Sequence, residues 1–300
     1  MHPESSLSAE SSGRDPRLPY APPPGHVRYR LEAQWDGAGF VGWQSQPGQR
    51  SVQDTLQAAL EGLAPNVPAV ALRPVAAGRT DTGVHAESMT LHWDISDDLK
   101  LAPERLIRAL NGQLPPDLSV LDLKVAATDF HARYSCVGRS YVYRVLNTPQ
   151  RRPLWQGRAL HVPQPLNLEA MQQAAQRLVG DHDFAAFATR EERQTQRTLY
   201  RLDVQRHSEL VEFHLHGESF LRQMVRCMVG TLLLVGRGEL GPDDVGDILA
   251  SKNRPQAGPN VSPHGLYFSG ASYPAAVFPG SVAVFPGPVA VFPESVFEEV

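Results

Sequence analysis

The sequence has few cysteines and no long apolar run. Cys136 and Cys227 are the only cysteines among 300 residues, and their spacing fits neither a metal site nor a redox motif. We therefore expect two free thiols in a cytoplasmic protein. No apolar stretch approaches the roughly 18 residues of a membrane span, and residues 1–25 lack the apolar core of a signal peptide. We expect neither a membrane segment nor a disulfide-stabilised fold.

Acidic residues are missing from one long interval, which extends from Asp129 to Glu169. The interval interleaves six arginines with five aromatic residues, namely Arg133, Arg139, Arg144, Arg151, Arg152 and Arg158 with Phe130, Tyr134, Tyr141, Tyr143 and Trp155. Such a composition is typical of a surface that binds phosphates and stacks bases, although a solvated basic face above core aromatics fits it equally well. The net charge of −4 does not exclude nucleic acid, because the two ends of the chain contribute all of it.

Two segments at the ends differ in composition from the rest of the chain. Residues 1–25 are rich in serine, proline and charge, so we expect a disordered tail. Residues 274–300 form a second tail, in which Val-Phe-Pro recurs every seven residues at 277–279, 284–286 and 291–293. The prolines exclude a helix or a central strand there. The repeats indicate no function to us.

Hydrophobic periodicity between the tails predicts the same order of elements twice. Residues 26–130 should contain a strand at 27–35, a helix from Ser51, strands at 70–76 and 88–94, a helix from Pro103 and a strand at 120–126. Residues 131–273 should contain a strand at 140–146, a helix at 167–179, a hairpin of 199–207 with 209–216, helices at 219–235 and 242–250, and a strand at 265–272. Two βαββαβ halves predict an α+β protein with helices on one side of the sheet. The other parts of the expectation are a joined, mainly antiparallel sheet and a central cleft open to RNA.

Residues 78–85, Gly-Arg-Thr-Asp-Thr-Gly-Val-His, are the most distinctive stretch. The glycines permit a sharp backbone path that directs Asp81 towards a ligand. Arg79 is close enough in sequence to help keep that carboxylate ionised. An ordinary polar hairpin loop would use the same residue types. Asp81 is therefore a candidate catalytic residue that needs support from other parts of the chain.

That support comes from a resemblance that covers about residues 27–273. The stretch resembles the catalytic motif of the tRNA pseudouridine synthase A family, usually Gly-Arg-Thr-Asp-Ala-Gly-Val-His, with Thr82 in place of alanine. Four further segments resemble the family in the same order, namely 36–44, Phe130–Ser135, Arg139–Tyr143 and Phe220–Arg226. The resemblance implies the pseudouridine synthase fold, which has the two-half architecture expected above.

The resemblance also implies an activity, an isomerisation of uridine to pseudouridine at positions 38, 39 and 40 of the tRNA anticodon stem-loop. The reaction breaks the bond between ribose C1′ and base N1, rotates the base and rejoins it through C5. We therefore expect no metal, no nucleotide and no other cofactor, and the family implies a homodimer. One carboxylate could attack the ribose, attack the base or remove the 2′ proton, and the sequence leaves all three open.

The resemblance assigns roles to individual residues. Asp81 would act as nucleophile or base, Tyr141 would stack on the flipped uracil with its hydroxyl near C5, and Arg226 would pair with Asp81. A core position for Tyr141 and a helix-surface position for Arg226 are the plain alternatives, although an arginine on an otherwise apolar helix needs a partner. The other residues expected to bind RNA are Arg79, Phe130, His131, Arg133, Arg139 and Arg197.

Two other classes of function remain as alternatives. One is an RNA-binding protein that has lost catalysis, against which the intact Asp81, Tyr141 and Arg226 argue. The other is a hydrolase that cleaves glycosides or nucleosides, which usually needs two paired carboxylates. Asp81 has no obvious partner in the sequence. The spacing of His85, His92 and His131 fits no common metal site.

Overall fold

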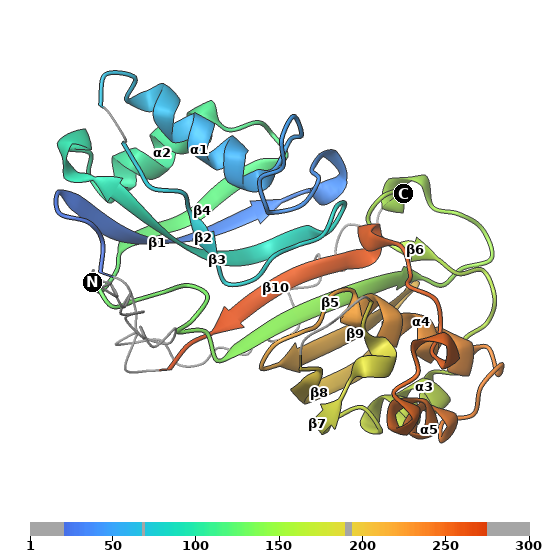
Figure 1. The fold of residues 1–300 in the computed structure, drawn as a ribbon. Coiled ribbons are helices and arrows are strands. Elements are labelled where there is room, and N and C mark those ends of the chain that lie inside the picture. The colour runs from blue at the N-terminus through green and yellow to red at the C-terminus, as the bar shows by residue number, and fades with distance from the viewer. Residues whose placement is uncertain (1–20, 68–69, 190–193, 275–300) are drawn as a thin grey trace, which may run out of the picture.

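One ten-stranded sheet runs through the computed structural model, which describes residues 21–67, 70–189 and 194–274 (Figure 1). The first half contains β1 (His26–Trp35), α1 (Val52–Leu63), β2 (Val75–Ala76), β3 (His85–Ser96), α2 (Pro103–Gln113) and β4 (Leu118–Val125). The second half contains β5 (Gly138–Leu146), β6 (Leu160–His161), α3 (Leu168–Gln176), β7 (Gly180–Asp183), β8 (Gln196–His207), β9 (Leu210–Gly217), α4 (Met224–Gly236), α5 (Asp244–Ser251) and β10 (Leu266–Ser272). The predicted α+β class is confirmed, and the short strands β6 and β7 were not predicted.

Both halves place their strands in the same spatial order. The path through the sheet is β4-β1-β3-β10-β5-β9-β8-β7, with β2 beside β3 and β6 beside β5. The order β4-β1-β3-β2 in the first half therefore corresponds to β10-β5-β9-β8 in the second half. The halves meet where β10 lies parallel to β3, with Tyr267 opposite His85 and Phe268 opposite Ala86. Except for this pair and the pair of β5 with β6, all the pairings between these named strands are antiparallel. The expectation of a joined, mainly antiparallel sheet is therefore confirmed.

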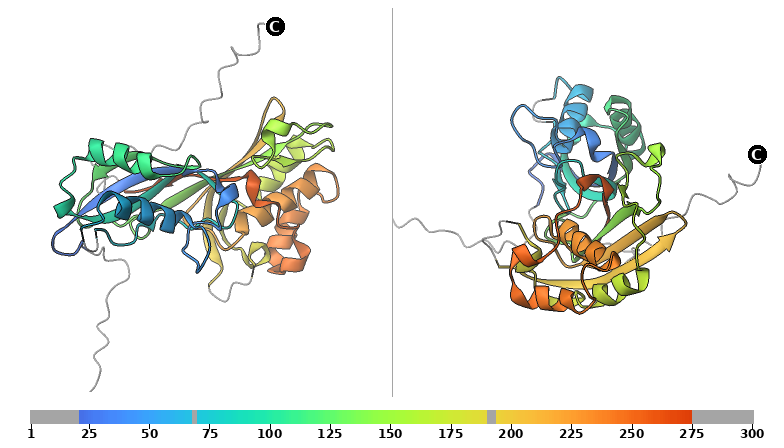
Figure 2. Two further views of the ribbon diagram at one scale, coloured as in Figure 1. Left: turned by 90° about the horizontal axis from the view of Figure 1, so that it is seen from above. Right: turned by 90° about the vertical axis from the view of Figure 1, so that its right-hand side faces the viewer.

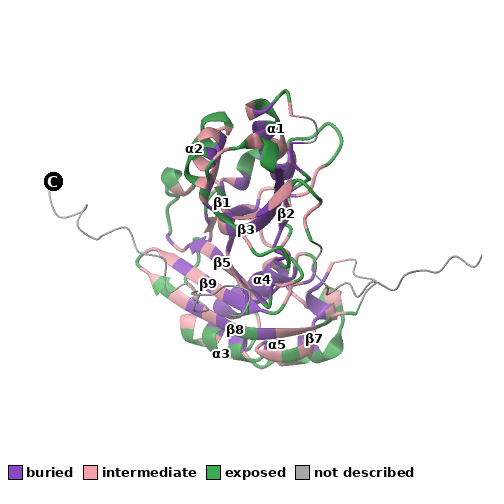
Figure 3. Ribbon diagram, turned by 90° about the vertical axis from the view of Figure 1, so that its left-hand side faces the viewer, coloured by how far each residue is buried: buried purple, intermediate pink, exposed green. Residues whose placement is uncertain are grey.

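A row of register partners shows which face the helices cover. Trp35 lies opposite Ala86, Ala86 opposite Phe268, Phe268 opposite Tyr141, and Tyr141 opposite Leu215. Register partners share one face of a sheet. The first three belong to the core that includes α1 and α2, Leu215 belongs to the core that includes α3 and α4, and Tyr141 packs against both. Both helix groups therefore cover the same face, and Figure 3 shows α1 and α2 at one end of the molecule and α3 and α5 at the other. Figure 2 gives two further views of this arrangement.

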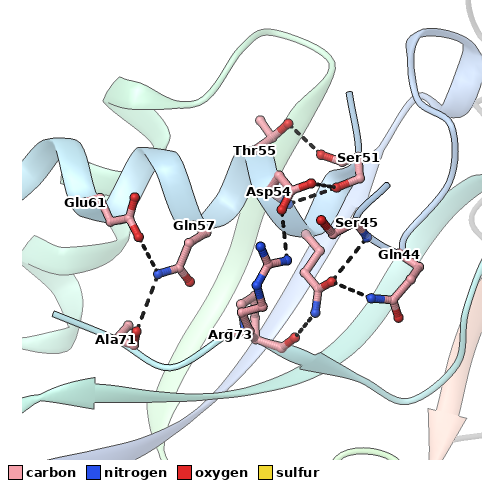
Figure 4. A network of polar contacts seen from close by, with 11 residues as sticks. Gln44, Ser45, Ser51, Asp54, Thr55, Gln57, Glu61, Ala71 and Arg73 are labelled. Carbon is pink, nitrogen blue, oxygen red and sulfur yellow. Dashed lines mark hydrogen bonds and ion pairs between the residues drawn. The ribbon is translucent and has the colours of Figure 1, made fainter. Parts of the chain in front are cut away.

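Helix α1 begins where its sequence predicts. The Ser51 hydroxyl accepts a hydrogen bond from the Asp54 backbone N–H at 3.0 Å and donates to the Asp54 carboxylate at 2.7 Å. Arg73 donates to the other carboxylate oxygen of Asp54 at 2.9 Å. The side chain of Gln53, on the same turn, accepts from the Gln44 side chain and from the Ser45 backbone N–H. These contacts tie the start of α1 to the chain on both sides of it (Figure 4).

Several predicted elements are shorter than expected, and two of them have a local cause. The strand expected at 70–76 is reduced to β2 and one isolated bridge between Ala71 and Ile95. Pro74 lies between them, and a proline has no N–H to give to a sheet. The helix expected from residue 219 begins only at Met224, because Gln223 has a left-handed backbone with φ of 60°.

The described chain begins at residue 21 and ends at residue 274. Residues 23–26 form a turn in which the His26 N–H donates to the Pro23 carbonyl and leads into β1. Most of the expected tail at 1–25, and the Val-Phe-Pro repeats of the tail at 274–300, lie outside the described residues. Cys136 and Cys227 are buried free thiols, as expected. None of the helices described here is long and apolar enough to cross a membrane.

Candidate active site

A cavity of about 470 Å³ lies between the Asp81 loop and the segment Phe220–Arg226, beside Tyr141. Its lining comes from both halves of the chain, namely Ala77–Asp81, Val84, Arg133, Arg139, Tyr141, Phe220–Arg226 and Leu266. The structure thus brings together Asp81, Tyr141 and Arg226, the three residues for which the family resemblance implies catalytic roles. Of the expected RNA-binding residues, Arg79, Arg133 and Arg139 line the same cavity.

The Asp81 loop is held by close backbone contact with the segment after β1. The Trp43 N–H donates to the Thr80 carbonyl at 3.1 Å, and the Thr82 hydroxyl donates to the Val41 carbonyl at 2.9 Å. Gly42 has φ of 105°, and a Cβ there would lie 2.4 Å from the Thr80 carbonyl oxygen. Only glycine fits this position. The half-buried Asp81 is therefore presented to the cavity by a loop with little freedom.

His85 anchors the far end of this loop through hydrogen bonds at both of its ring nitrogens. Its Nδ1 accepts from the Gly37 N–H at 2.9 Å, and its Nε2 lies 3.0 Å from the Gly157 carbonyl and 3.1 Å from the His264 carbonyl. The ring stacks on Tyr267 with 4.7 Å between centroids. Burial lowers the pKa of His85, so the imidazole is neutral and Nε2 donates to the carbonyls. His85 thus ties the loop to the second half.

Tyr141 is fixed by two aromatic neighbours. Its ring meets Phe220 edge to face at 5.0 Å and Phe268 edge to face at 5.3 Å between centroids. The residue keeps part of its surface exposed and lines the cavity. Burial raises the pKa of the Tyr141 hydroxyl, the charge of Arg139 opposes this, and the charge of Asp81 raises it further. The hydroxyl is therefore protonated at neutral pH.

Arg226 lies on the first turn of α4, where its Nε donates to the Val261 carbonyl at 2.6 Å. The expected ion pair between Asp81 and Arg226 is absent from the described residues, although both side chains line the same cavity. The bond to Val261 holds the guanidinium on the wall of the second half. The carboxylate of Asp81 and the guanidinium of Arg226 therefore both line the cavity without forming an ion pair with each other.

The cavity is strongly basic. Five of its lining residues are arginines, Arg79, Arg133, Arg139, Arg222 and Arg226, and Asp81 is its one carboxylate among the described residues. Such a concentration of positive charge attracts a polyanion. Arg222 had no role in the sequence prediction. The segment Phe220–Arg226 resembles the family, but the sequence predicts that it is helical from residue 219. In the structure, Arg222 precedes the helix and lies in the cavity wall.

Three residues expected to bind RNA lie outside the cavity lining. Phe130 is fully buried and packs against Tyr273 with 5.3 Å between ring centroids. His131 is 7% exposed, and its Nδ1 accepts from the backbone N–H groups of Arg133 and Tyr134. Arg197 lies on β8 and donates to nearby backbone carbonyls. Phe130 and His131 therefore support the turn that carries Arg133.

The acid-free interval does not form one basic surface. Three of its arginines meet carboxylates from other segments: Arg144 pairs with Glu87 and Glu212, Arg152 with Glu209, and Arg158 with Asp36. Tyr143 is fully buried and donates its hydroxyl hydrogen to the Ser262 carbonyl. The interval contributes Arg133, Arg139 and Tyr141 to the cavity, and most of its other basic residues are neutralised by folding.

Among the described residues, one group of side chains could surround a metal ion, and it lies on β8 and β9 away from the cavity. The group consists of His207, Glu212 and His214. Glu212 already accepts from Arg144 at 2.9 Å. The chemistry available in the cavity is therefore that of a carboxylate, a phenol and arginines.

Comparison with known proteins gives consistent results. Residues 174–274 match the family model described as tRNA pseudouridine synthase. Three proteins named tRNA pseudouridine synthase A are similar over most of their length. The protein of Dechloromonas aromatica (strain RCB) is 43% identical over 82% of this chain and 93% of its own. The proteins of Rhizorhabdus wittichii and Zymomonas mobilis are 44% and 41% identical over 83% and 82% of this chain and 97% and 99% of their own. A solved Cbf5-Nop10-Gar1 complex aligns at 11% identity with a TM-score of 0.31, covering 81% of this chain and 58% of that one, a likeness too distant to support a conclusion.

Proposed function

The chain belongs to the tRNA pseudouridine synthase A family and is an isomerase that acts on tRNA, and from this premise we propose that its cavity converts uridines 38, 39 and 40 of the anticodon stem-loop. One observation carries the proposal. Asp81, Tyr141 and five arginines from both halves converge on one cavity. A base can react in such a site only after it leaves the stack.

The size and charge of the cavity fit one flipped nucleotide. A volume of about 470 Å³ accommodates a single base with its ribose and excludes a stacked duplex. Arg79, Arg133 and Arg222 are exposed at its wall and can contact the phosphates on either side. Tyr141 offers its ring for stacking on the uracil.

Asp81 breaks the bond between N1 and C1′ in this proposal. It attacks the ribose, attacks the base or removes the 2′ proton, and each of these routes requires a carboxylate that faces the cavity, as Asp81 does. The base then rotates, C5 bonds to C1′, the C5 proton leaves and N1 gains a proton. Atoms and electrons balance without a redox partner, so the reaction needs no cofactor. Arg226 stabilises negative charge in the cavity instead of forming a closed pair with Asp81.

Tyr141 has a second role beside stacking. Its hydroxyl faces the same cavity and assists the removal of the C5 proton. Because burial raises the pKa of Tyr141, the hydroxyl is protonated at neutral pH. Its oxygen accepts the C5 proton while its own proton passes to solvent, and solvent supplies the proton that N1 gains.

We also propose a cytoplasmic homodimer. One cavity is small beside a tRNA, so a second copy would provide the additional surface that the substrate needs. Light scattering at micromolar concentration tests this proposal. A monomer that retains full activity contradicts it.

The function is tested by mapping pseudouridine in tRNA from a strain that lacks the gene. Loss of the modification at positions 38–40, restored by the wild-type gene and not by an Asp81→Asn variant, supports the proposal. Unchanged modification in the deletion strain indicates a binding protein without catalysis. Release of free uracil from tRNA by the purified protein indicates a hydrolase, against which the single carboxylate of the cavity argues.

A further inference from the structure

Arg139 stands out among the cavity arginines because of its hydrogen bonds. It lies on β5, two residues before Tyr141, in the interval whose arginines were expected to contact RNA phosphates. A phosphate contact requires guanidinium N–H groups that are available to an incoming ligand. In Arg139 each of these N–H groups already donates to a backbone carbonyl.

All five N–H donors of the Arg139 guanidinium have carbonyl acceptors. Nε and Nη2 donate to the Ala77 carbonyl at 3.2 and 3.1 Å, and Nη2 also donates to the Arg133 carbonyl at 2.8 Å. Nη1 donates to the carbonyls of Cys136 at 3.3 Å and Glu218 at 2.6 Å. These bonds use the full planar fork of the side chain.

The four acceptors belong to three segments that build the cavity. Ala77 directly precedes Gly78 and the Asp81 loop. Arg133 and Cys136 lie in the turn that leads into β5. Glu218 is two residues before Phe220, which packs against Tyr141 and begins the wall that ends at α4. One side chain therefore joins the Asp81 loop of the first half to the wall of the second half.

Only arginine can make this junction. Lysine presents three donors on one atom, so it cannot reach carbonyls on opposite sides of a planar fork. The carbonyls that lose their donor would seek other partners, and the segments would separate. A displacement of about 1 Å in a reacting group can lower a rate by about 100-fold.

We infer that Arg139 is a positioning residue, which sets the Asp81 loop against the wall of the second half and does not bind tRNA phosphate. The inference rests on the proposed function of the cavity, since the consequence is measured as pseudouridine formation. It separates Arg139 from Arg133, which lines the same cavity with an exposed side chain.

The first test compares Arg139→Lys and Arg139→Gln with the matched control Arg133→Gln. For each we measure the single-turnover rate at saturating enzyme, the Kd for tRNA and the slope of log Kd against log salt. We expect both Arg139 variants to lose about 100-fold in rate, with a Kd and a salt slope close to wild type. Arg133→Gln should weaken binding and flatten the slope by about one counterion. A normal rate in Arg139→Lys, or a weakened Kd with a flattened slope in Arg139→Gln, overturns the inference.

A second test uses the wild-type protein, so it does not depend on the folding of a variant. An arginine-selective dicarbonyl reagent is applied with and without tRNA, and modified residues are identified by mass spectrometry. Arg139 should react slowly in both states, whereas Arg133 should react readily and be protected by tRNA. Rapid modification of Arg139 that tRNA prevents overturns the inference. An inactive wild-type protein in the first test would instead count against the proposed function.

Discussion

Tyr141 and Phe268 are register partners on β5 and β10, and their rings meet edge to face with 5.3 Å between centroids. Phe268 is fully buried in the core of the first half, while Phe220, on the other side of Tyr141, belongs to the second half. The catalytic tyrosine of the proposed mechanism is therefore oriented by packing between the halves before substrate binds. Such preorganisation removes an entropic cost from the reaction step.

Tyr141→Phe tests the role of the hydroxyl. The phenyl ring keeps both aromatic contacts and the stacking face, so tRNA affinity should stay near wild type. Removal of the C5 proton loses its acceptor, so the rate of completed isomerisation should fall by about 100-fold or more. Single-turnover assays with a parallel binding measurement check this. Normal turnover would restrict Tyr141 to stacking.

Gly42→Ala tests the support of the Asp81 loop. The new Cβ would lie 2.4 Å from the Thr80 carbonyl oxygen on a backbone with φ of 105°. The matched control is Gly48→Ala, because Gly48 has φ of 70° and nothing within 4 Å of an added Cβ. The control should cost only the roughly 1–2 kcal/mol of a left-handed backbone, with normal activity. Gly42→Ala should cost more in urea unfolding and lose about 100-fold in rate. Equal effects at the two positions would mean that the loop tolerates displacement.

The positions of two arginines give a prediction about salt. Arg133 lines the cavity and is exposed, whereas Arg152, from the same acid-free interval, lies outside the cavity lining and pairs with Glu209. Arg133→Gln should weaken tRNA binding and flatten the salt slope by about one, and Arg152→Gln should leave both unchanged. Filter binding between 50 and about 200 mM salt provides the measurement. A flattened slope in Arg152→Gln would extend the RNA surface beyond the cavity.

Stability should fall in mild acid because of His92 and His131, whose rings lie 4.4 Å apart between centroids. Burial lowers the pKa of His92 to about 3 and that of His131 to about 4. In the unfolded chain both histidines have the ordinary pKa of about 6.5, so they take up protons as the pH falls below that value. In the folded protein both histidines are still neutral at this pH. The unfolded state binds more protons over this window, so the free energy of unfolding decreases as pH falls from about 6.5 to about 4.

The slope should be about 1.4 kcal/mol per pH unit for each histidine. His131→Asn keeps an acceptor for the N–H groups of Arg133 and Tyr134 and removes one titrating group. Urea unfolding between pH 6.5 and 5 should therefore give a shallower pH dependence for this variant than for wild type. Identical slopes would show that His131 does not titrate on unfolding.

The sequence predicted the order of elements and the residues of the cavity better than it predicted their contacts. Alternation, the Ser51 cap and Pro103 are local signals, and the structure follows them. Ion pairs such as that of Arg144 with Glu87 join residues far apart in the chain, so composition alone made the interval look more basic than it is. The sequence gives no sign of the left-handed backbone at Gln223, because residues other than glycine rarely adopt this conformation.

The site residues also differ in how much of their role the sequence predicts. Asp81 and Tyr141 lie in two segments that resemble the family, and the structure brings both to one cavity. Arg139 was recognised as part of a motif, but its hydrogen bonds to three separate segments could be seen only after folding. Phe130 is expected from the sequence to bind RNA, yet it is fully buried. Aromatic residues serve equally in cores and in stacking sites, so the sequence cannot distinguish the two.

The most direct test of the account is the single-turnover rate of pseudouridine formation by Asp81→Asn, measured beside its tRNA affinity. Asparagine keeps the size of the side chain but can act neither as nucleophile nor as base. We expect the variant to remain folded and its pseudouridine formation to fall below detection. It should bind tRNA as tightly as the wild type or more tightly, because a negative charge has left a basic cavity. Pseudouridine formed at a near-normal rate by well-folded Asp81→Asn protein would contradict the assignment of the catalytic carboxylate.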